Sequence, residues 1–195
     1  GNITPVVFME FSVTGSSIDI IQELSAVLTP EQVAVDPASL ETYGQDWTRF
    51  TPPAPTAIVF PRDTADVVAV VECARRCQFA LVPSGGRTGL SGGACAANGE
   101  VVVSMDKMNA ISPVNLTDRT VTVGAGAITQ NVQQAARDAD LFYPVDFASS
   151  GSSQIGGNIA TNAGGINVIR YGMTREWVAG LTCLLYTSPS PRDRF

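Results

Sequence analysis

Glycine is concentrated in two short segments of this chain, and the first of them limits the possible folds most strongly. Residues 85–93 contain five glycines within nine residues, directly after an apolar run that ends at Val82. Glycine adopts positive φ angles and lets another group approach the backbone closely. Consecutive N–H groups in such a loop can converge on an anion. The segment therefore predicts a strand followed by an anion-binding loop, with a glycine-rich surface hairpin as the alternative.

Side chains of the same loop favour a diphosphate as the anion. Ser84, Thr88 and Ser91 supply hydroxyl groups, and Arg87 supplies one positive charge. The loop lacks the Gly-x-Gly-x-x-Gly spacing of the Rossmann dinucleotide fold and the Gly-Lys-Ser/Thr end of a P-loop. We therefore expect a diphosphate held mainly by backbone N–H groups, in a fold of another kind.

A second segment of small residues, also expected to be a loop, lies at 149–165, where Asn158, Thr161 and Asn162 offer hydrogen bonds. Small residues permit the close approach of a large flat ligand. Ordering two such segments costs conformational entropy, and one extended ligand shared by both would explain them. Residues 142–146 either line the same cleft or form an ordinary turn.

Apolar periodicity predicts the elements around these segments. Helices are expected at 18–28, at 36–43, after an Asp63 N-cap and at 128–139, and strands at 57–60, 79–82, 101–104 and 120–123. The units 57–60 and 79–82, with the helix between them, form a β-α-β unit. Because strands and helices alternate irregularly, we expect an α+β domain and not a regular doubly wound sheet.

Composition excludes several classes of protein. The net charge of −6 and the pI near 4.5 argue against a nucleic-acid partner, which needs a basic surface. No apolar stretch reaches the roughly 18 residues of a transmembrane helix. The first residues carry no basic segment of the kind that opens a signal peptide. We therefore expect a cytoplasmic protein without a transmembrane segment.

The four cysteines form no pattern typical of a disulfide framework or a metal site. Cys73 and Cys77 share one face of a predicted helix, but no third cysteine follows closely, and the chain contains no histidine. Zinc is therefore disfavoured, and we expect reduced thiols in packed positions and no bound metal. The lack of histidine also means that an imidazole base cannot come from this chain.

The two ends of the chain differ from the part between them. Met9 opens a more ordinary stretch, so we interpret residues 1–8 as upstream sequence. Residues 183–195 place prolines in a polar run that resembles translated adapter sequence from assembled libraries. We interpret them as a non-native tail, with a proline-rich linker as the alternative.

Three ordered motifs resemble one known family. They are residues 83–94, residues 143–146, and residues 156–165 followed by Arg170-Tyr171-Gly172. They are similar to the FAD-binding domain of the vanillyl-alcohol oxidase and p-cresol methylhydroxylase (PCMH) superfamily. The closest resemblance is to the group with the glycolate oxidase FAD subunit, D-lactate dehydrogenase and D-2-hydroxyglutarate dehydrogenase.

The resemblance implies an organisation for the chain. Residues 55–182 would form a PCMH-type FAD-binding domain of the α+β class, incomplete at its C-terminal end. Residues 9–54 would form a helical segment and linker before it. The chain would then be the N-terminal part of a longer enzyme.

The resemblance also implies which residues contact FAD. The loop 84–93 would hold the diphosphate, 156–165 would follow the flavin and its ribityl chain, and Pro144 and Asp146 would lie on the adenine or diphosphate side. Covalent relatives carry a histidine in the first loop, where this chain has Arg87, so we expect non-covalent FAD. Arg87 also departs from the asparagine common in the closest group. The expected FAD-binding residues are Pro83, Ser84, Gly85, Gly86, Arg87, Thr88, Gly89, Leu90, Ser91, Gly92, Gly93, Pro144, Asp146, Ser150, Gly156, Gly157, Asn158, Thr161, Asn162, Ala163 and Gly164.

The activity implied by the resemblance is FAD-dependent oxidation of a D-2-hydroxy acid, such as lactate, glycolate or 2-hydroxyglutarate, to the 2-oxo acid. The hydride would pass to the flavin, and the electron acceptor is unknown. Because the family's substrate site lies largely in a later domain, no catalytic residue is assigned and the chain alone is expected to be inactive. The alternatives are a non-catalytic flavin-binding or electron-transfer module, or an oxidase of another alcohol. Glycine loops recognise the cofactor and do not separate these functions.

Overall fold

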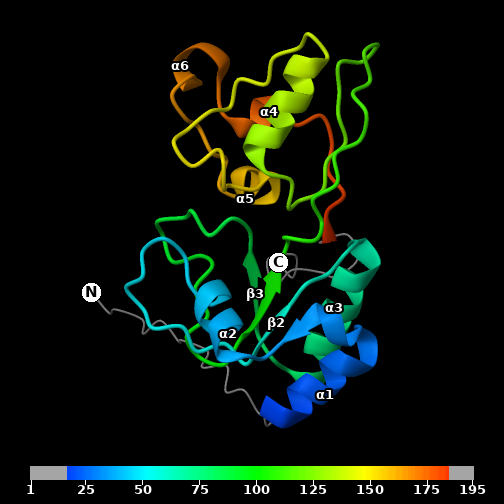
Figure 1. The fold of residues 1–195 in the computed structure, drawn as a ribbon, viewed down its shortest axis with the longest axis vertical. Helices are drawn as coiled ribbons and strands as arrows, with labels where there is room; N and C mark the ends of the chain where they lie inside the picture. The colour runs from blue at the N-terminus through cyan, green and yellow to red at the C-terminus, as the bar shows by residue number, and fades with distance from the viewer. Residues whose placement is uncertain (1–16, 185–195) are drawn as a thin grey trace, which may run out of the picture.

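The computed structural model describes residues 17–184, which form two lobes stacked along the long axis of the molecule (Figure 1). The expectations for residues 1–8 and for the tail from residue 185 lie outside the described residues. In chain order the elements are α1 (Ser17–Val27), the 3-10 helix η1 (Pro30–Gln32), β1 (Val33–Ala34), α2 (Pro37–Tyr43), β2 (Ala57–Val59), α3 (Thr64–Cys77), β3 (Leu81–Ser84), β4 (Val101–Ser104), α4 (Thr129–Asp138), α5 (Ile155–Ala160), α6 (Val168–Tyr171) and the 3-10 helix η2 (Thr174–Trp177).

The lower lobe contains a sheet with the strand order β1-β2-β4-β3. Strands β2, β4 and β3 are parallel, and β1 pairs with β2 in the antiparallel direction. Strand β4 therefore lies between β2 and β3, the two strands of the β-α-β unit that contains α3. Every residue of β4 is buried, as expected for a central parallel strand covered on both faces.

Helices cover the two faces of this sheet. Ile20 and Leu24 of α1 pack with Val70 and Cys73 of α3 against one face. On the other face, Ile58 and Val102 form a smaller cluster with residues of α2. The spacing of four residues between Ile20 and Leu24 places both side chains on one side of α1. The periodicity that predicted this helix rested on Ile21, Leu24 and Leu28 among others, and these three pack in the same cluster. The upper lobe, with α4, α5 and α6, stands beyond the carboxyl ends of the parallel strands (Figure 1).

Local signals in the sequence explain how the helices begin. Asp63 accepts a hydrogen bond from the Asp66 backbone N–H at 2.9 Å and caps α3, as predicted. Asp36 caps α2 by accepting from the Ser39 N–H at 2.9 Å. The predicted mixture of helices and strands is confirmed as a mixed α/β fold with a mixed sheet.

Three details of the prediction were wrong. Residues 120–123 form no strand, because Thr120 and Val123 take part only in isolated bridges to Asn115 and Ile111. A two-stranded ribbon without a third strand is weakly stabilised. The segment 149–165 is not wholly loop, since it contains α5. The strand predicted at 79–82 lies two residues later, at Leu81–Ser84, because Leu81 is the first residue to pair with β4.

We predict that Leu24→Ala destabilises the chain by about 2–5 kcal/mol, because it opens a cavity between α1 and the sheet. Leu24 is 0% exposed, whereas Leu116 is 67% exposed. The control Leu116→Ala should change the free energy of unfolding by less than about 0.5 kcal/mol. Urea denaturation measures both. Equal effects would show that α1 is not part of the core.

Candidate cofactor-binding site

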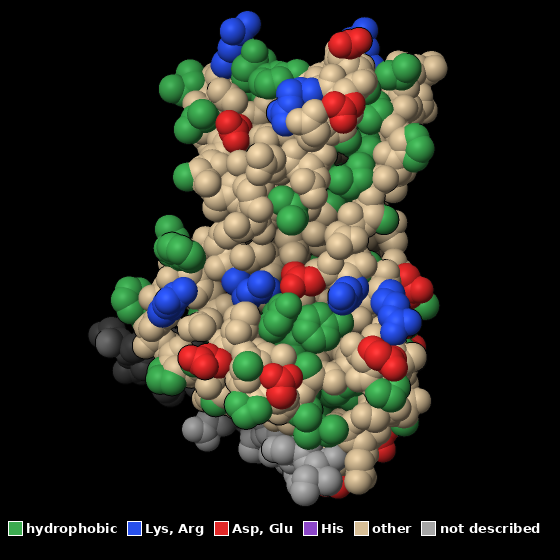
Figure 2. Space-filling model, viewed as in Figure 1, with side chains coloured by type: hydrophobic (Ala, Val, Ile, Leu, Met, Phe, Trp, Pro, Cys, Tyr) green, Lys and Arg blue, Asp and Glu red, His purple; other side chains and the backbone are tan. Residues whose placement is uncertain are grey.

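A cleft of about 700 Å³ lies where the two lobes meet. Its volume is within the range of about 300–1,000 Å³ that is usual for ligand pockets. On the face drawn in Figure 2 the molecule narrows between the lobes, and charged side chains of both signs gather just below. The residues that line the cleft are Gly86, Arg87, Asp106, Asn109, Gly126, Ile128, Asn131, Gly151, Ser152 and Gln154.

The two glycine-rich segments meet at the cleft through their backbones. A Cβ atom on Gly86 would lie 2.0 Å from the carbonyl oxygen of Ser152, so no other residue fits there without a shift. Next to this contact, Gln154 Nε2 donates to Asp106 Oδ1 at 2.7 Å. The first segment follows β3 and Asp106 follows β4. Because these strands are parallel, their carboxyl ends meet at one edge of the sheet, where α/β folds commonly bind ligands.

Arg87 carries a positive charge that is held in place on three sides. Its guanidinium carbon lies 4.4 Å from the centre of the Tyr43 ring. Its Nη1 donates to the Gly85 carbonyl oxygen at 3.1 Å and lies 3.8 Å from Asp106 Oδ1. Tyr43 donates to Asp106 Oδ2 at 3.0 Å. Burial, together with this hydrogen bond, raises the pKa of Tyr43 and keeps its hydroxyl protonated.

The far end of the first loop is anchored by Asp46, which is 3% exposed. Its Oδ2 accepts from the Gly92 N–H at 2.8 Å. Its Oδ1 accepts from the N–H and the hydroxyl of Thr48 at 2.8 and 2.6 Å. Burial acts to raise the pKa of Asp46, but the hydrogen bonds from Thr48, Cys95 and Gly92 outweigh it and hold the pKa below its usual value. Asp46 therefore ties the loop to the segment after α2.

The predicted residues of the first loop take different positions. Gly86 and Arg87 line the cleft. Pro83 and Ser84 belong to β3, where Ser84 is buried. Gly85 lies against the Gln154 side chain, and Thr88 follows Arg87 in the half-buried part of the loop. The outer residues Gly89, Leu90, Ser91, Gly92 and Gly93 are exposed and are not among the residues that line the cleft.

The predicted residues of the second region mostly serve the packing of the upper lobe. Asn158 is buried and donates to Thr129 Oγ1 at 2.6 Å. Asp146 accepts from Gln133 at 3.2 Å, and the Pro144 carbonyl oxygen accepts from Asn167 at 3.0 Å. Other predicted residues form internal contacts of the same kind. The carbonyl oxygens of Ser150 and Ala163 accept from the Gln130 N–H and from Thr174, Thr161 donates to the Gly157 carbonyl oxygen, and Asn162 accepts from the Arg175 N–H. Gly156 and Gly164 lie against Ala125 and Val168. Their contact with a cofactor stays a prediction.

Sequence reasoning did not assign Asp106, Gln154 or Asp46 to the site. Asp106 carried a usable signal, because it lies two residues after the carboxyl end of a predicted strand, Val101–Ser104, where ligands are commonly bound. Gln154 lay inside the second glycine-rich segment but was not singled out. Asp46 carried no local signal, since its bond to Gly92 spans 46 residues.

Solved structures with the same architecture define the class of this fold. Alkyldihydroxyacetonephosphate synthase superimposes with a TM-score of 0.75 at 22% identity, over 89% of this chain and 38% of that chain. p-Cresol methylhydroxylase superimposes with a TM-score of 0.66 at 21% identity, over 78% of this chain and 31% of that chain. The described lobes thus have the fold of a PCMH-type FAD-binding domain. Sequence comparison agrees, and the chain belongs to the family described as "FAD binding domain", whose model matches residues 55–188.

Individual relatives narrow the comparison. The D-2-hydroxyglutarate dehydrogenase of Stutzerimonas stutzeri is 59% identical over 83% of this chain and 35% of its own length. The glycolate oxidase subunit GlcD of Bacillus subtilis is 34% identical over 86% of this chain and 36% of its own length. The chain therefore spans about a third of the length of these curated relatives. Both lie in the group that the motifs resembled, so the family prediction and FAD as the cofactor are confirmed.

The geometry of the cleft fits such a cofactor. Within the described part of the chain, the buried atoms Ser84 Oγ and Gln154 Oε1 have no hydrogen-bond partner. Ser84 directly precedes the first glycine-rich segment, and Gln154 lines the cleft. Buried polar atoms are normally satisfied, so unpaired ones suggest a ligand. Gly86 leaves no side chain between the backbone and the cleft, and Arg87 provides a fixed positive charge for a diphosphate.

Residues 17–184 contain no helix long and apolar enough to cross a membrane.

We predict that Gly86→Ala destabilises the chain by about 1–3 kcal/mol, because the new Cβ would push against the Ser152 backbone. The control is Gly93→Ala, where nothing lies within 4 Å of the added Cβ. That substitution should be neutral or slightly stabilising. Urea denaturation of the two variants measures the difference. A Gly86→Ala variant as stable as the control would mean that the lobes do not meet at this point.

We predict that Asp46→Asn lowers the free energy of unfolding at pH 7 by about 1–3 kcal/mol, because the new amide cannot accept all the bonds of the carboxylate. Folding lowers the pKa of Asp46. Its contribution to the free energy of unfolding is therefore fully present above about pH 4 and is lost as the pH falls through the folded-state pKa. The variant should lack that part of the acid sensitivity. Urea denaturation from pH 7 downward measures this.

Asp140→Asn, at an exposed position, is the control for Asp46. If both variants have the same stability and the same pH profile, the anchoring role of Asp46 is refuted.

Proposed function

We propose that this chain is the FAD-binding part of a FAD-dependent dehydrogenase that oxidises a D-2-hydroxy acid to the 2-oxo acid. 2-Hydroxyglutarate is the favoured substrate, because the Stutzerimonas stutzeri relative with that activity in its name is 59% identical. Glycolate is the second candidate, supported by the 34% identity to a glycolate oxidase subunit. Both belong to the same substrate class.

The contact of the two glycine-rich segments at the cleft carries the FAD-binding part of this proposal, and the relatives carry the substrate class. Gly86 and Arg87 enter the cleft from one lobe, and Gly151, Ser152 and Gln154 enter it from the other. A ligand that touches both lobes must be extended, as a dinucleotide is. The N–H groups after β3 and the Arg87 guanidinium would hold the diphosphate. The predicted contacts of Pro144, Asp146 and residues 156–164 belong to the same proposal.

The bound flavin would accept the hydride from the α-carbon of the hydroxy acid. The residues of this chain would position it, through close backbone approach at Gly86 and through the charge of Arg87. Asp106 holds Arg87 and Gln154 at once, so it would keep both side chains oriented toward the cleft. The base for the hydroxyl proton is not an imidazole of this chain, because the chain contains no histidine.

Arg87 also supports non-covalent attachment of FAD, since an arginine forms no flavin linkage of the kind that a histidine makes. The electron acceptor is left open. The bacterial relatives are compatible with the cytoplasmic location proposed from the sequence.

A chimaera tests the function. This chain would replace the matching segment of the Stutzerimonas stutzeri relative, and the purified protein would be mixed with D-2-hydroxyglutarate, glycolate or D-lactate without oxygen. We expect the purified chimaera to carry flavin that is released when the protein is denatured. The absorption of this flavin should bleach fastest with D-2-hydroxyglutarate. A folded chimaera with flavin that no hydroxy acid reduces would support the non-catalytic alternative. A folded chimaera without flavin would overturn the proposal.

We predict that Arg87→Gln in the same chimaera weakens FAD binding about 10- to 100-fold. The loss of one charge-assisted contact of about 1.5–3 kcal/mol corresponds to this range. Arg49→Gln is the matched control, because Arg49 also has a positive φ and also lies over an aromatic ring, that of Trp47, but is not among the residues that line the cleft. Flavin fluorescence titration measures both. Equal affinities would exclude Arg87 from the diphosphate site.

A further inference from the structure

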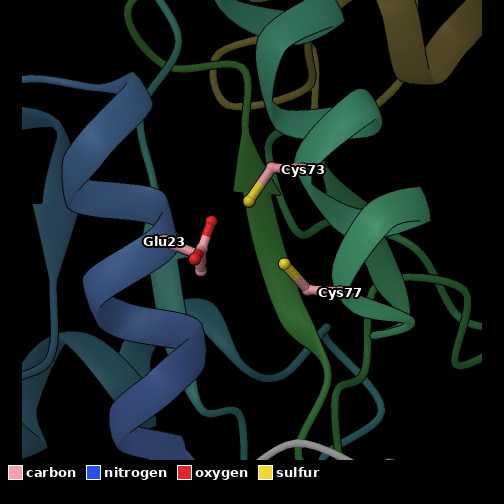
Figure 3. A group of neighbouring side chains, drawn as sticks. All are labelled: Glu23, Cys73 and Cys77. Atoms are coloured by element: carbon pink, nitrogen blue, oxygen red, sulfur yellow. The ribbon is translucent and has the colours of Figure 1, made fainter.

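A cluster of three potential metal ligands lies between α1 and α3, at a distance from the cleft. One carboxylate oxygen of Glu23 and the sulfur atoms of Cys73 and Cys77 all lie within 4.8 Å of one another. Figure 3 shows the three side chains pointing into the same space, Glu23 from α1 and both cysteines from α3. The spacing of four residues explains why both thiols face α1. The expectation of no metal site rested on the lack of a third cysteine close behind Cys77 and of any histidine, whereas α1 supplies a carboxylate.

We propose that Glu23, Cys73 and Cys77 form a binding site for a thiophilic divalent cation such as Zn²⁺. Two thiolates and one carboxylate are a ligand set that suits this ion, with a water molecule as the fourth ligand. Zinc–sulfur bonds of about 2.3 Å in a tetrahedron place the ligand atoms about 3–4 Å apart. The ligand atoms, at most 4.8 Å apart, would therefore move closer together by about 1 Å when an ion binds.

The surroundings of the cluster suit an ion. Cys73 is fully buried, whereas the Glu23 side chain is 45% exposed, so an ion can enter from the Glu23 side and lie against the core. Arg76 Nη2 donates to Glu23 Oε2 at 2.7 Å and can orient the carboxylate as an outer-shell partner. Two thiolates, one carboxylate, the divalent ion and the Arg76 guanidinium together carry no net charge. That balance lowers the cost of placing the ion beside the core.

Both thiols can serve the same ion, because a metal ion displaces the thiol protons as it binds and the two sulfur atoms lie within 4.8 Å of each other. The consequence of binding would be mechanical, since the ion would fasten α1 to α3.

Cadmium, which gives a thiolate-to-metal charge-transfer absorption in the ultraviolet, is the probe. We expect the full 195-residue chain to bind one Cd²⁺ with this absorption. Cys77→Ser should abolish the signal, and Glu23→Gln should weaken binding at least about tenfold, as losses around metal sites commonly do. Cys95→Ser is the matched control, because Cys95 is a half-buried cysteine outside the cluster. It should leave both signal and affinity unchanged.

A second measurement separates the loss of metal binding from a folding defect in the Cys77→Ser variant. Zn²⁺ should raise the unfolding midpoint of the wild-type chain and of Cys95→Ser, but not that of Cys77→Ser. The proposal is overturned if Cys77→Ser retains the cadmium absorption, if Cys95→Ser loses it, or if Zn²⁺ stabilises all variants equally.

Discussion

The close approach of Gly86 to the Ser152 carbonyl group is the constraint on which the rest of the structure depends. It joins a loop of the sheet lobe to a segment of the helical lobe without an intervening side chain. A larger residue would separate the lobes and change the shape of the cleft between them. The hydrogen bond from Gln154 to Asp106 reinforces the same junction. The cleft is thus defined by backbone contact, which tolerates little adjustment.

Charge at the cleft is organised around this junction. Asp106 contacts Arg87, Tyr43 and Gln154, so one carboxylate links the first loop, α2 and the second glycine-rich segment. Asp46 holds the opposite end of the first loop through Gly92. Asp46 and Asp106 both lie far along the chain from the residues that they contact. Together they fix a flexible, glycine-rich loop in one arrangement before any ligand binds, which reduces the entropy that binding must overcome.

Much of the fold could be predicted because its signals are local. The apolar spacing of Ile21, Leu24 and Leu28, the Asp63 cap and the buried run of β4 each specify an element from neighbouring residues. Residues 120–123 have an apolar pattern typical of a strand, yet form only bridges, because pairing depends on partners elsewhere in the chain. Of the residues that line the cleft, sequence reasoning had named Gly86 and Arg87. Asp46 and Gln154 were not assigned, since their contacts with Gly92 and Asp106 span 46 and 48 residues. Asp106 was not assigned, although its place after β4 offered a signal.

Hydrogen–deuterium exchange of the chain, with and without an excess of FAD, tests most directly whether the cleft between the lobes is the cofactor site. Excess FAD populates the complex even if binding is weak. If the cleft holds the diphosphate, protection should appear together in residues 84–93 and 149–158, and residues 64–77 of α3 should be unchanged. Protection in only one of the two glycine-rich segments, or in neither, would contradict a site shared by both lobes.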